Sequence, residues 1–341
     1  MRKIALVLIW VAITGVAGVT FSQARSATPP VSLLDALPDG TAVAVIDFQK
    51  VAGSSLWATI NSQDKFKREI DRAQSEVAEL GLKLTDVHTV ALLFSGTAIK
   101  TPTVALTGGF EQSDLLARLR ASAKVRLTSE KYKGNDIYSV RALRAGGPTN
   151  GLSGTKSDTT GIDAGKRGET SFVFYDPNTV VIGSLDAVRA SVDVKTGAKP
   201  GLTQNTKLTE ALAQNPAAAI RFAFTLSPAL TGELRSGDLP VDFSSISMIF
   251  GAIDVGSGID LNATLRSDTA EHAKSISDSL NSLLTMARGL LGSTGDPKMV
   301  PVAELLKTVS ITSADADVRI TGQLPMELLN SLLSSSAKKG Q

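Results

Sequence analysis

Short runs of apolar residues, separated by turn-forming residues, recur along the whole chain. Residues 41–47 form the first run, which follows the Pro38-Asp39-Gly40 turn and is rich in strand-favouring residues. The same pattern predicts an antiparallel sheet. Further single strands are expected over 217–226, 310–313 and 317–321, and hairpins over 88–106, 124–140, 171–183 and 246–265.

Apolar residues at spacings of three and four predict the helices. The clearest stripe lies in 62–80, among many charged residues, and favours a helix lying on a sheet, with a coiled-coil seam as the alternative. A long helix is predicted over 268–291, where Asp268 and Glu271 resemble a capping box. Further helices are expected over 48–57, 111–121, 185–192, 227–234, 302–309 and 325–333.

The order of these elements repeats along the chain, although the amino-acid sequence itself does not. Both halves read strand, helix, hairpin, helix, strands, helix. We therefore expect an α+β fold of two tandem repeats over 35–200 and 201–335, each an antiparallel sheet with helices packed on one face. One continuous sheet built by both repeats is the alternative. Composition predicts a flexible loop over 145–170 and a disordered tail over 336–341.

The N-terminus has the three-part pattern of a secretory signal peptide. Arg2 and Lys3 precede the uncharged residues 4–19, and Ser22-Gln23-Ala24 offers small residues for cleavage. We expect residues 1–24 to be a signal peptide cleaved near Ala24, so that the protein is periplasmic or secreted. The alternative is an inner-membrane anchor formed by residues 4–21, which is short for a spanning helix. Both interpretations place the body of the protein outside the cytoplasm.

Composition excludes several function classes. The chain of 341 residues has 35 basic and 33 acidic residues, and cleavage would remove two basic ones and no acid, so the mature chain is neutral. A neutral chain with 5% aromatic residues lacks the charge and the stacking groups of a nucleic-acid binder. The absence of cysteine excludes disulfides, zinc–thiolate sites, iron–sulfur clusters and cysteine nucleophiles.

Candidate catalytic motifs are few and poorly placed. His88 and His272 have no metal-binding spacing around them, and we expect both to be structural. Ser62-Gln63-Asp64-Lys65 and Lys195-Thr196-Gly197 match parts of a Ser-Lys enzyme signature. However, the Ser-x-x-Lys pattern also occurs at 153–156 and 335–338, and Lys195 follows a predicted helix rather than lying on a strand, so we interpret these matches as coincidental.

The remaining polar motifs have ordinary structural explanations. The glycine-rich segments 151–157 and 251–258 lack the context of a phosphate-binding loop. Asp315 and Asp317 are expected in a tight turn, and Asp254 and Asp260 flank another turn. The glycosylation motif at 262–264 lies within a predicted strand. We therefore predict no catalytic, cofactor-binding or metal-ligating residue, and no cofactor.

Four segments carry a resemblance to a known group of proteins. They are Leu37-Pro38-Asp39-Gly40-Thr41, residues 81–87, residues 132–138, and Val180-Val181-Ile182-Gly183 followed by the helix from Leu185. Together they resemble a loose group of exported bacterial proteins of unknown function, including those with domains of the DUF3352 type. The resemblance implies an extracytoplasmic α+β duplication and supplies no catalytic residues.

These observations favour an exported, non-catalytic binding or structural module of the bacterial cell envelope or periplasm. Its expected partner is a protein or an apolar small molecule, bound by a broad sheet or an apolar groove. The membrane would be contacted only through an uncleaved N-terminal segment. The alternative is an exported hydrolase whose serine and acidic residues converge from distant parts of the chain.

Overall fold

The computed structural model describes residues 33–62, 67, 71, 74, 86–95, 102–143, 169–226, 243–293 and 299–337. The predicted helix 62–80, the helix 227–234 and the signal peptide lie wholly or largely outside these residues, as do most of the loop 145–170 and of the tail 336–341. Residues 169 and 170 of that loop belong to a strand. In the described part of the chain, every helix falls short of the length and apolarity that a bilayer crossing requires.

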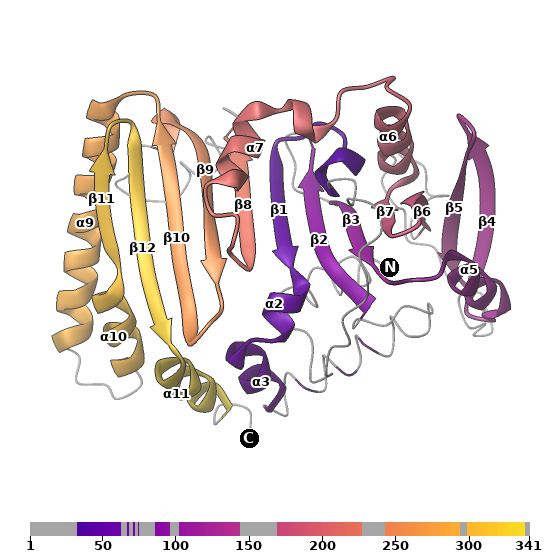
Figure 1. The fold of residues 1–341 in the computed structure, drawn as a ribbon. Helices are drawn as coiled ribbons and strands as arrows, with labels where there is room; N and C mark the ends of the chain where they lie inside the picture. Colours follow the sequence, from indigo (N-terminus) through magenta and orange to yellow (C-terminus); the bar gives the residue numbers. More distant parts are fainter. Residues whose placement is uncertain are drawn as a thin grey trace, which may run out of the picture.

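Twelve antiparallel strands form one continuous sheet (Figure 1). The strands are β1 (Ala42–Asp47), β2 (Val87–Phe94), β3 (Thr103–Gly108), β4 (Val125–Tyr132), β5 (Asn135–Ala142), β6 (Glu169–Asp176), β7 (Thr179–Gly183), β8 (Ile220–Thr225), β9 (Ile246–Asp254), β10 (Gly258–Ser267), β11 (Ser310–Ala314) and β12 (Asp317–Pro325). Their order across the sheet is β11-β12-β10-β9-β8-β1-β2-β3-β7-β6-β5-β4. The α+β class expected from the sequence is therefore confirmed.

The first strands of the two expected repeats meet in the middle of this sheet. β1 pairs with β8, with Ala42 opposite Phe224 and Ile46 opposite Ile220. Outward from this seam the order is β1-β2-β3-β7-β6 on one side and β8-β9-β10-β12-β11 on the other, and the β4–β5 hairpin extends the first side. The sheet is thus continuous, as in the alternative architecture stated above.

Helices surround the sheet. They are α2 (Phe48–Ala52), α3 (Ser55–Ser62), α5 (Gln112–Ala121), α6 (Leu185–Lys195), α7 (Thr206–Ala213), α9 (Ala270–Ser293), α10 (Val300–Thr308) and α11 (Met326–Ala337), with short 3₁₀ turns η1 (Leu33–Ala36), η3 (Leu202–Gln204) and η4 (Phe243–Ser245). In Figure 1, α9 lies beside β11 at one end of the sheet and α5 lies beside β4 at the other.

The two faces of the sheet are distinguished by cross-strand register. Val43 pairs with Leu93 and Ala223, whereas Ala44 pairs with Leu92 and Phe222, so we name the two sides the Val43 face and the Ala44 face. η1, α6 and α7 pack on the Val43 face. α2, α3, α5 and α11 pack on the Ala44 face, and α9 covers its β10–β12 end.

The expectation of helices on one face is therefore corrected. Ala91, Leu92 and Leu93 are consecutive residues of β2 and are 0%, 5% and 0% exposed. Since consecutive strand residues point to opposite faces, such a run is buried only if both faces are covered. The edge strands β4 and β11 instead carry mostly exposed or half-buried side chains.

Local signals located most of the elements but missed α7. The sequence analysis predicted no element over 206–213, although Asn205 caps the helix by accepting the backbone N–H of Leu208. Leu208, Ala211 and Leu212 form its buried stripe. The predicted helix 48–57 is divided into α2 and α3 at Gly53, and the predicted helix 302–309 begins at Val300.

The start of α9 differs from the expected capping box by one residue. The Thr269 hydroxyl, rather than Asp268, accepts the N–H of His272 at 3.1 Å. The Asp268 carboxylate lies 2.7 Å from the His272 ring nitrogen Nδ1, and this hydrogen bond lowers the pKa of Asp268. The Asp268 carboxylate is therefore hydrogen-bonded to a side chain, and Thr269 is the residue that caps α9.

Substitution of this cap should be measurable. We expect Thr269→Ala to lower the free energy of unfolding by about 1 kcal/mol, because one N–H in the first turn of α9 loses its acceptor. The measurement is urea denaturation followed by circular dichroism. Glu271→Ala is the control, with an expected change below about 0.5 kcal/mol. Equal losses for the two variants would contradict the assignment of Thr269 as the cap.

Candidate functional site

A buried carboxylate lies near the end of α6. Among the described residues, Asp193 is the one charged residue in the buried class, with 4% of its surface exposed. A charge in such a position needs close partners of opposite charge. The partners come from the β4–β5 turn and from the segment after α6.

Three side chains donate to this carboxylate. The ammonium group of Lys133 lies 2.6 Å from Oδ1, and that of Lys199 lies 3.0 Å from Oδ2. The Tyr132 hydroxyl donates to Oδ1 at 3.0 Å. The hydrogen bonds from Lys133 and then Lys199 lower the pKa of Asp193 to about 2, and the same contact raises the pKa of Lys133.

The β4–β5 turn is built to reach α6. Lys133 and Gly134 are its two central residues and have φ values of 48° and 80°, as a type I′ turn requires. The left-handed backbone is unfavourable for a lysine, and the ion pair with Asp193 offsets this cost. Arg189 of α6 adds a second connection, because its guanidinium lies 2.8 Å from the Glu130 carboxylate and 5.5 Å from the centre of the Tyr132 ring.

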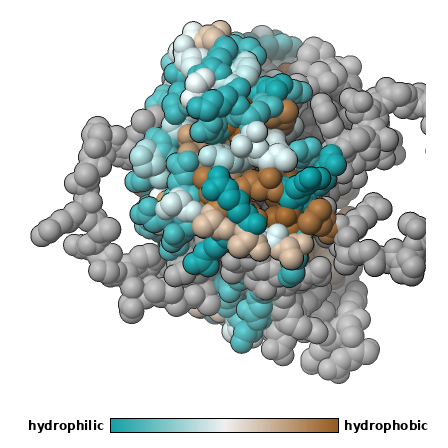
Figure 2. Space-filling view, turned by 90° about the vertical axis from the view of Figure 1, so that its right-hand side faces the viewer, coloured by the Kyte–Doolittle hydropathy of each residue, from teal (hydrophilic) through white to brown (hydrophobic). Residues whose placement is uncertain are grey.

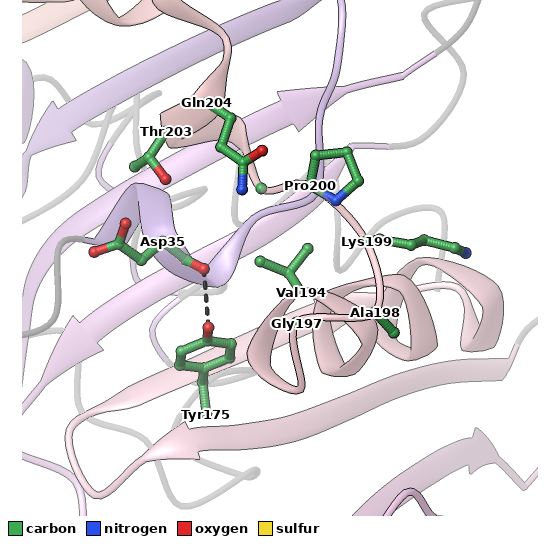
Figure 3. A pocket seen from close by; sticks show the side chains of 10 residues that line it. Asp35, Tyr175, Val194, Gly197, Ala198, Lys199, Pro200, Thr203 and Gln204 are labelled. Carbon is green, nitrogen blue, oxygen red and sulfur yellow. Dashed lines mark hydrogen bonds between the residues drawn. The ribbon is translucent and has the colours of Figure 1, made fainter.

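A surface pocket of about 410 Å³ lies beside this cluster, between η1, β6 and the segment after α6 (Figure 3). The Tyr175 hydroxyl donates to the Asp35 carbonyl oxygen at 2.9 Å, and burial raises the pKa of Tyr175. Thr203 and Gln204 line another part of the wall. The Lys199 side chain extends away from Tyr175 in Figure 3, consistent with its bond to Asp193.

The chemistry of this cluster indicates a structural role, in which Asp193 holds two elements together. A carboxylate with a pKa of about 2 is a weak base at neutral pH, and a lysine with a raised pKa stays protonated and is a poor nucleophile. Ser191 is the nearest hydroxyl along α6, but it is fully buried and donates to the Ala36 carbonyl oxygen. Asp193 therefore joins the β4–β5 turn to α6.

The Ser-Lys candidates lie on opposite faces of the sheet. Ser62 ends α3 on the Ala44 face and donates to the Thr59 carbonyl oxygen at 2.7 Å. Lys195 ends α6 on the Val43 face, where its ammonium group lies 2.5 Å from the Tyr175 carbonyl oxygen. Thr196 donates to the last carbonyls of α6. The segments 151–157 and 153–156 lie outside the described residues, as does Lys338 of the last Ser-x-x-Lys match.

The other candidates have structural partners or positions. His88 is exposed on β2. Asp315 has a φ of 51° in the β11–β12 turn, as expected for an aspartate in a tight turn. Asp317 binds the Arg266 guanidinium through two contacts of 2.8 Å. Within the described ranges, no three histidines, aspartates or glutamates gather as metal ligands.

The polar residues of the 246–265 hairpin lie on its strands and do not form a binding site in its turn. Asp254 and Asp260 face each other across β9 and β10, next to the turn. Gly251 lies inside β9 and not in the turn, which corrects the interpretation of 251–258 as one loop. Asn262 lies within β10, as its strand pattern predicted.

A second feature is an apolar surface in the middle of the Ala44 face. We name it the central strip and define it by seven apolar residues on adjacent strands, of which six are half-buried and Leu261 is 36% exposed. Cross-strand register places them on one face. The central strip consists of Ala44, Phe94, Ile220, Phe222, Phe224, Ile253 and Leu261.

The same strands are much better covered on their other face. Val43, Ala223 and Phe250 are 1%, 0% and 1% exposed on the Val43 face. Among the described helices, α7 is the one with extensive contacts to β8 and β9, and it packs on the Val43 face. Phe222 and Phe224 stack at 5.4 Å with an angle of 12° between their rings. The central strip is thus an ordered apolar floor that retains contact with solvent.

A separate group of half-buried apolar side chains lies toward the β4–β5 edge. They are Leu127, Val140, Phe174 and Ile182, and they pack against the same core cluster as Ala44, Phe94, Ile220 and Ile253 of the central strip. Figure 2, which views the molecule from that side, shows apolar residues framed by hydrophilic ones. The central strip was not predicted from the sequence, because the residues of a strand do not indicate which of its two faces a helix will cover.

Comparisons of the chain with protein-family models, with curated proteins and with solved structures give no match.

Proposed function

We propose that the protein is an exported, non-catalytic binding module of the bacterial cell envelope or periplasm. Its guest is a small apolar molecule held on the central strip. The observation that carries this proposal is the incomplete burial of Phe222, Phe224 and Ile253 at the centre of a twelve-stranded sheet. Contiguous exposed apolar surface is unfavourable in water and typically marks a binding surface.

The guest is proposed to be small because the central strip is bordered by helices. α9 covers the adjoining β10–β12 end of the same face, and α3 and α11 contact β10. A large flat partner would have to avoid these helices, whereas a chain-like molecule fits along the strands. Aliphatic and aromatic side chains of this kind suit a lipid-like guest better than a sugar.

The strand order supports an internal duplication as the origin of this surface. Five strands on each side of the β1–β8 seam follow the same order. A pseudo-two-fold relation would place the seam, and with it the central strip, between the two repeats. Binding sites often form at such junctions. Export rests on residues 1–24 and on the resemblance to exported DUF3352-like proteins.

The proposal is tested by binding of N-phenyl-1-naphthylamine, a neutral apolar probe whose fluorescence rises in apolar surroundings. We expect saturable binding to the wild-type protein, and about tenfold weaker binding to Phe224→Gln, because the probe loses an apolar contact. Leu261→Gln provides a second variant at a more exposed position, where folding is less affected.

The matched control is Met286→Gln. Met286 is 58% exposed and lies on α9, outside the central strip, so its replacement should leave the affinity unchanged. Thermal unfolding of each variant establishes that it is folded. Absence of saturable probe binding, or equal affinity of all four proteins, would overturn the proposal.

A further inference from the structure

Two buried hydrogen-bond donors of α3 have no acceptor. They are Nε1 of Trp57 and Nδ2 of Asn61, and among the described buried side-chain nitrogen and oxygen atoms they are the two without a partner. The Trp57 side chain is almost completely buried, with 2% of the residue exposed. Residues four apart on a helix are neighbours on one face, so the two side chains leave α3 from the same face.

The helix that carries these donors borders the central strip. Two hydrogen bonds fix the start of α3. The Ser54 hydroxyl oxygen accepts the backbone N–H of Trp57, and the Ser55 hydroxyl donates to the Gly256 carbonyl oxygen of the β9–β10 turn at 2.7 Å. Trp57 belongs to the same core cluster as Val255 and Leu329 of α11, with Ile220 and Ile253 packed against it. α3 of the first half also contacts α11 and β10 of the second half.

The energetics indicate an acceptor from outside the chain. A buried donor without a partner costs on the order of 1–3 kcal/mol, and native proteins leave few such groups unpaired. One carbonyl oxygen has two lone pairs and can accept from both donors at once. A ligand that supplied such an oxygen would remove both penalties.

The surroundings favour a neutral acceptor over a charged one. Trp57 packs within a hydrophobic core cluster, and both donors are neutral. A carboxylate there would lose its hydration without gaining a positive partner, whereas an ester or amide carbonyl loses far less. The head of the ligand is therefore uncharged.

We propose that Trp57 and Asn61 bind the carbonyl oxygen of a neutral acyl ligand, an ester or amide whose alkyl chain lies on the central strip. This inference rests on the proposed function and adds the chemical class of the guest to it. The indole and the amide act as the polar end of the site, and Ile220 and Ile253 begin its apolar floor.

The test compares methyl decanoate with undecane and with decanoate, by displacement of N-phenyl-1-naphthylamine from the full chain. These ligands have similar length, and undecane has no acceptor. We expect the ester to bind about tenfold tighter than undecane to the wild-type protein, and decanoate to bind more weakly than the ester.

Variants of the two donor residues distinguish binding of the ligand's carbonyl group from binding of its alkyl chain. Asn61→Leu and Trp57→Phe should each reduce the preference for the ester over undecane to about threefold or less, while the affinity for undecane stays within about twofold. The two substitutions are read separately, so the inference remains testable if Trp57→Phe does not fold. Met286→Gln again serves as the control and should keep the tenfold preference.

The outcomes distinguish this inference from the proposed function. Equal binding of ester and undecane would overturn the carbonyl contact, leave an apolar site intact and indicate that water satisfies the two donors. Tighter binding of decanoate would overturn the neutral head group. Failure of the probe to bind at all would overturn the proposed function itself.

Discussion

Asp193→Asn is expected to lower the free energy of unfolding by about 2 kcal/mol, because the three donors lose the charged carboxylate that they share while the two partly exposed lysines stay hydrated. The loss extends to Lys133, whose left-handed backbone no longer has a compensating ion pair. The measurement is urea denaturation at neutral pH. The control is Asp278→Asn, which removes an exposed pair with Lys274 and should cost less than about 1 kcal/mol.

The same residue determines a pH dependence. Its pKa falls from the ordinary 3.8 to about 2 on folding, so its stabilisation is fully present above about pH 4. As the pH falls toward 2 the unfolded chain takes up the proton first, and this stabilisation is lost. The wild-type protein should therefore lose more stability than Asp193→Asn between pH 4 and pH 2. If the free energy of unfolding had the same pH dependence in the two proteins, the role of Asp193 as a buried, ionised structural residue would be contradicted.

Gly251→Ala is expected to destabilise the protein by about 3 kcal/mol. A Cβ atom at this position would lie 2.2 Å from the Asn262 carbonyl oxygen and 2.8 Å from the Ala263 Cα atom. Both contacts are with the backbone of β10, so the β9–β10 ladder would have to move. Thermal unfolding measures the loss.

The position also affects the central strip, because the added Cβ would lie 3.0 Å from the Phe222 ring. We therefore expect weaker probe binding by Gly251→Ala at temperatures where it remains folded. Gly256→Ala is the matched control in the same hairpin, since a Cβ there would have no neighbour within 4 Å. A change below about 1 kcal/mol for Gly251→Ala would show that the strands can separate without cost.

The sequence was informative where structure is set by adjacent residues. Alternating runs located the hairpins, and the Asp315 turn followed from the tolerance of aspartate for a left-handed backbone. The strand order was not accessible, because the pairing of β10 with β12, and not with β11, depends on contacts between distant segments. Cover on both faces was missed although Ala91-Leu92-Leu93 is an unbroken apolar run, a signal that can identify a strand buried on both sides.

The candidate sites were less accessible than the fold. Asp193 looks like an ordinary helical aspartate until the β4–β5 turn, sixty residues earlier in the chain, brings Lys133 to it. Trp57 and Asn61 have a spacing that puts them on one helix face, but the sequence cannot indicate that their polar atoms are buried without acceptors. Such sites are produced by packing between distant elements and leave no local motif.

Quenching of Trp57 fluorescence is the most direct test of an acyl guest on the Ala44 face. The chain has two tryptophans, and Trp10 lies in the segment that we expect to be cleaved. Trp57 is therefore the single reporter in the mature protein, or in Trp10→Phe where that segment is retained. A methyl decanoate brominated on its alkyl chain should quench this emission saturably, and unbrominated methyl decanoate should restore it. Quenching that rises linearly without saturation, as for a tryptophan in free solution, would contradict a bound acyl chain beside Trp57.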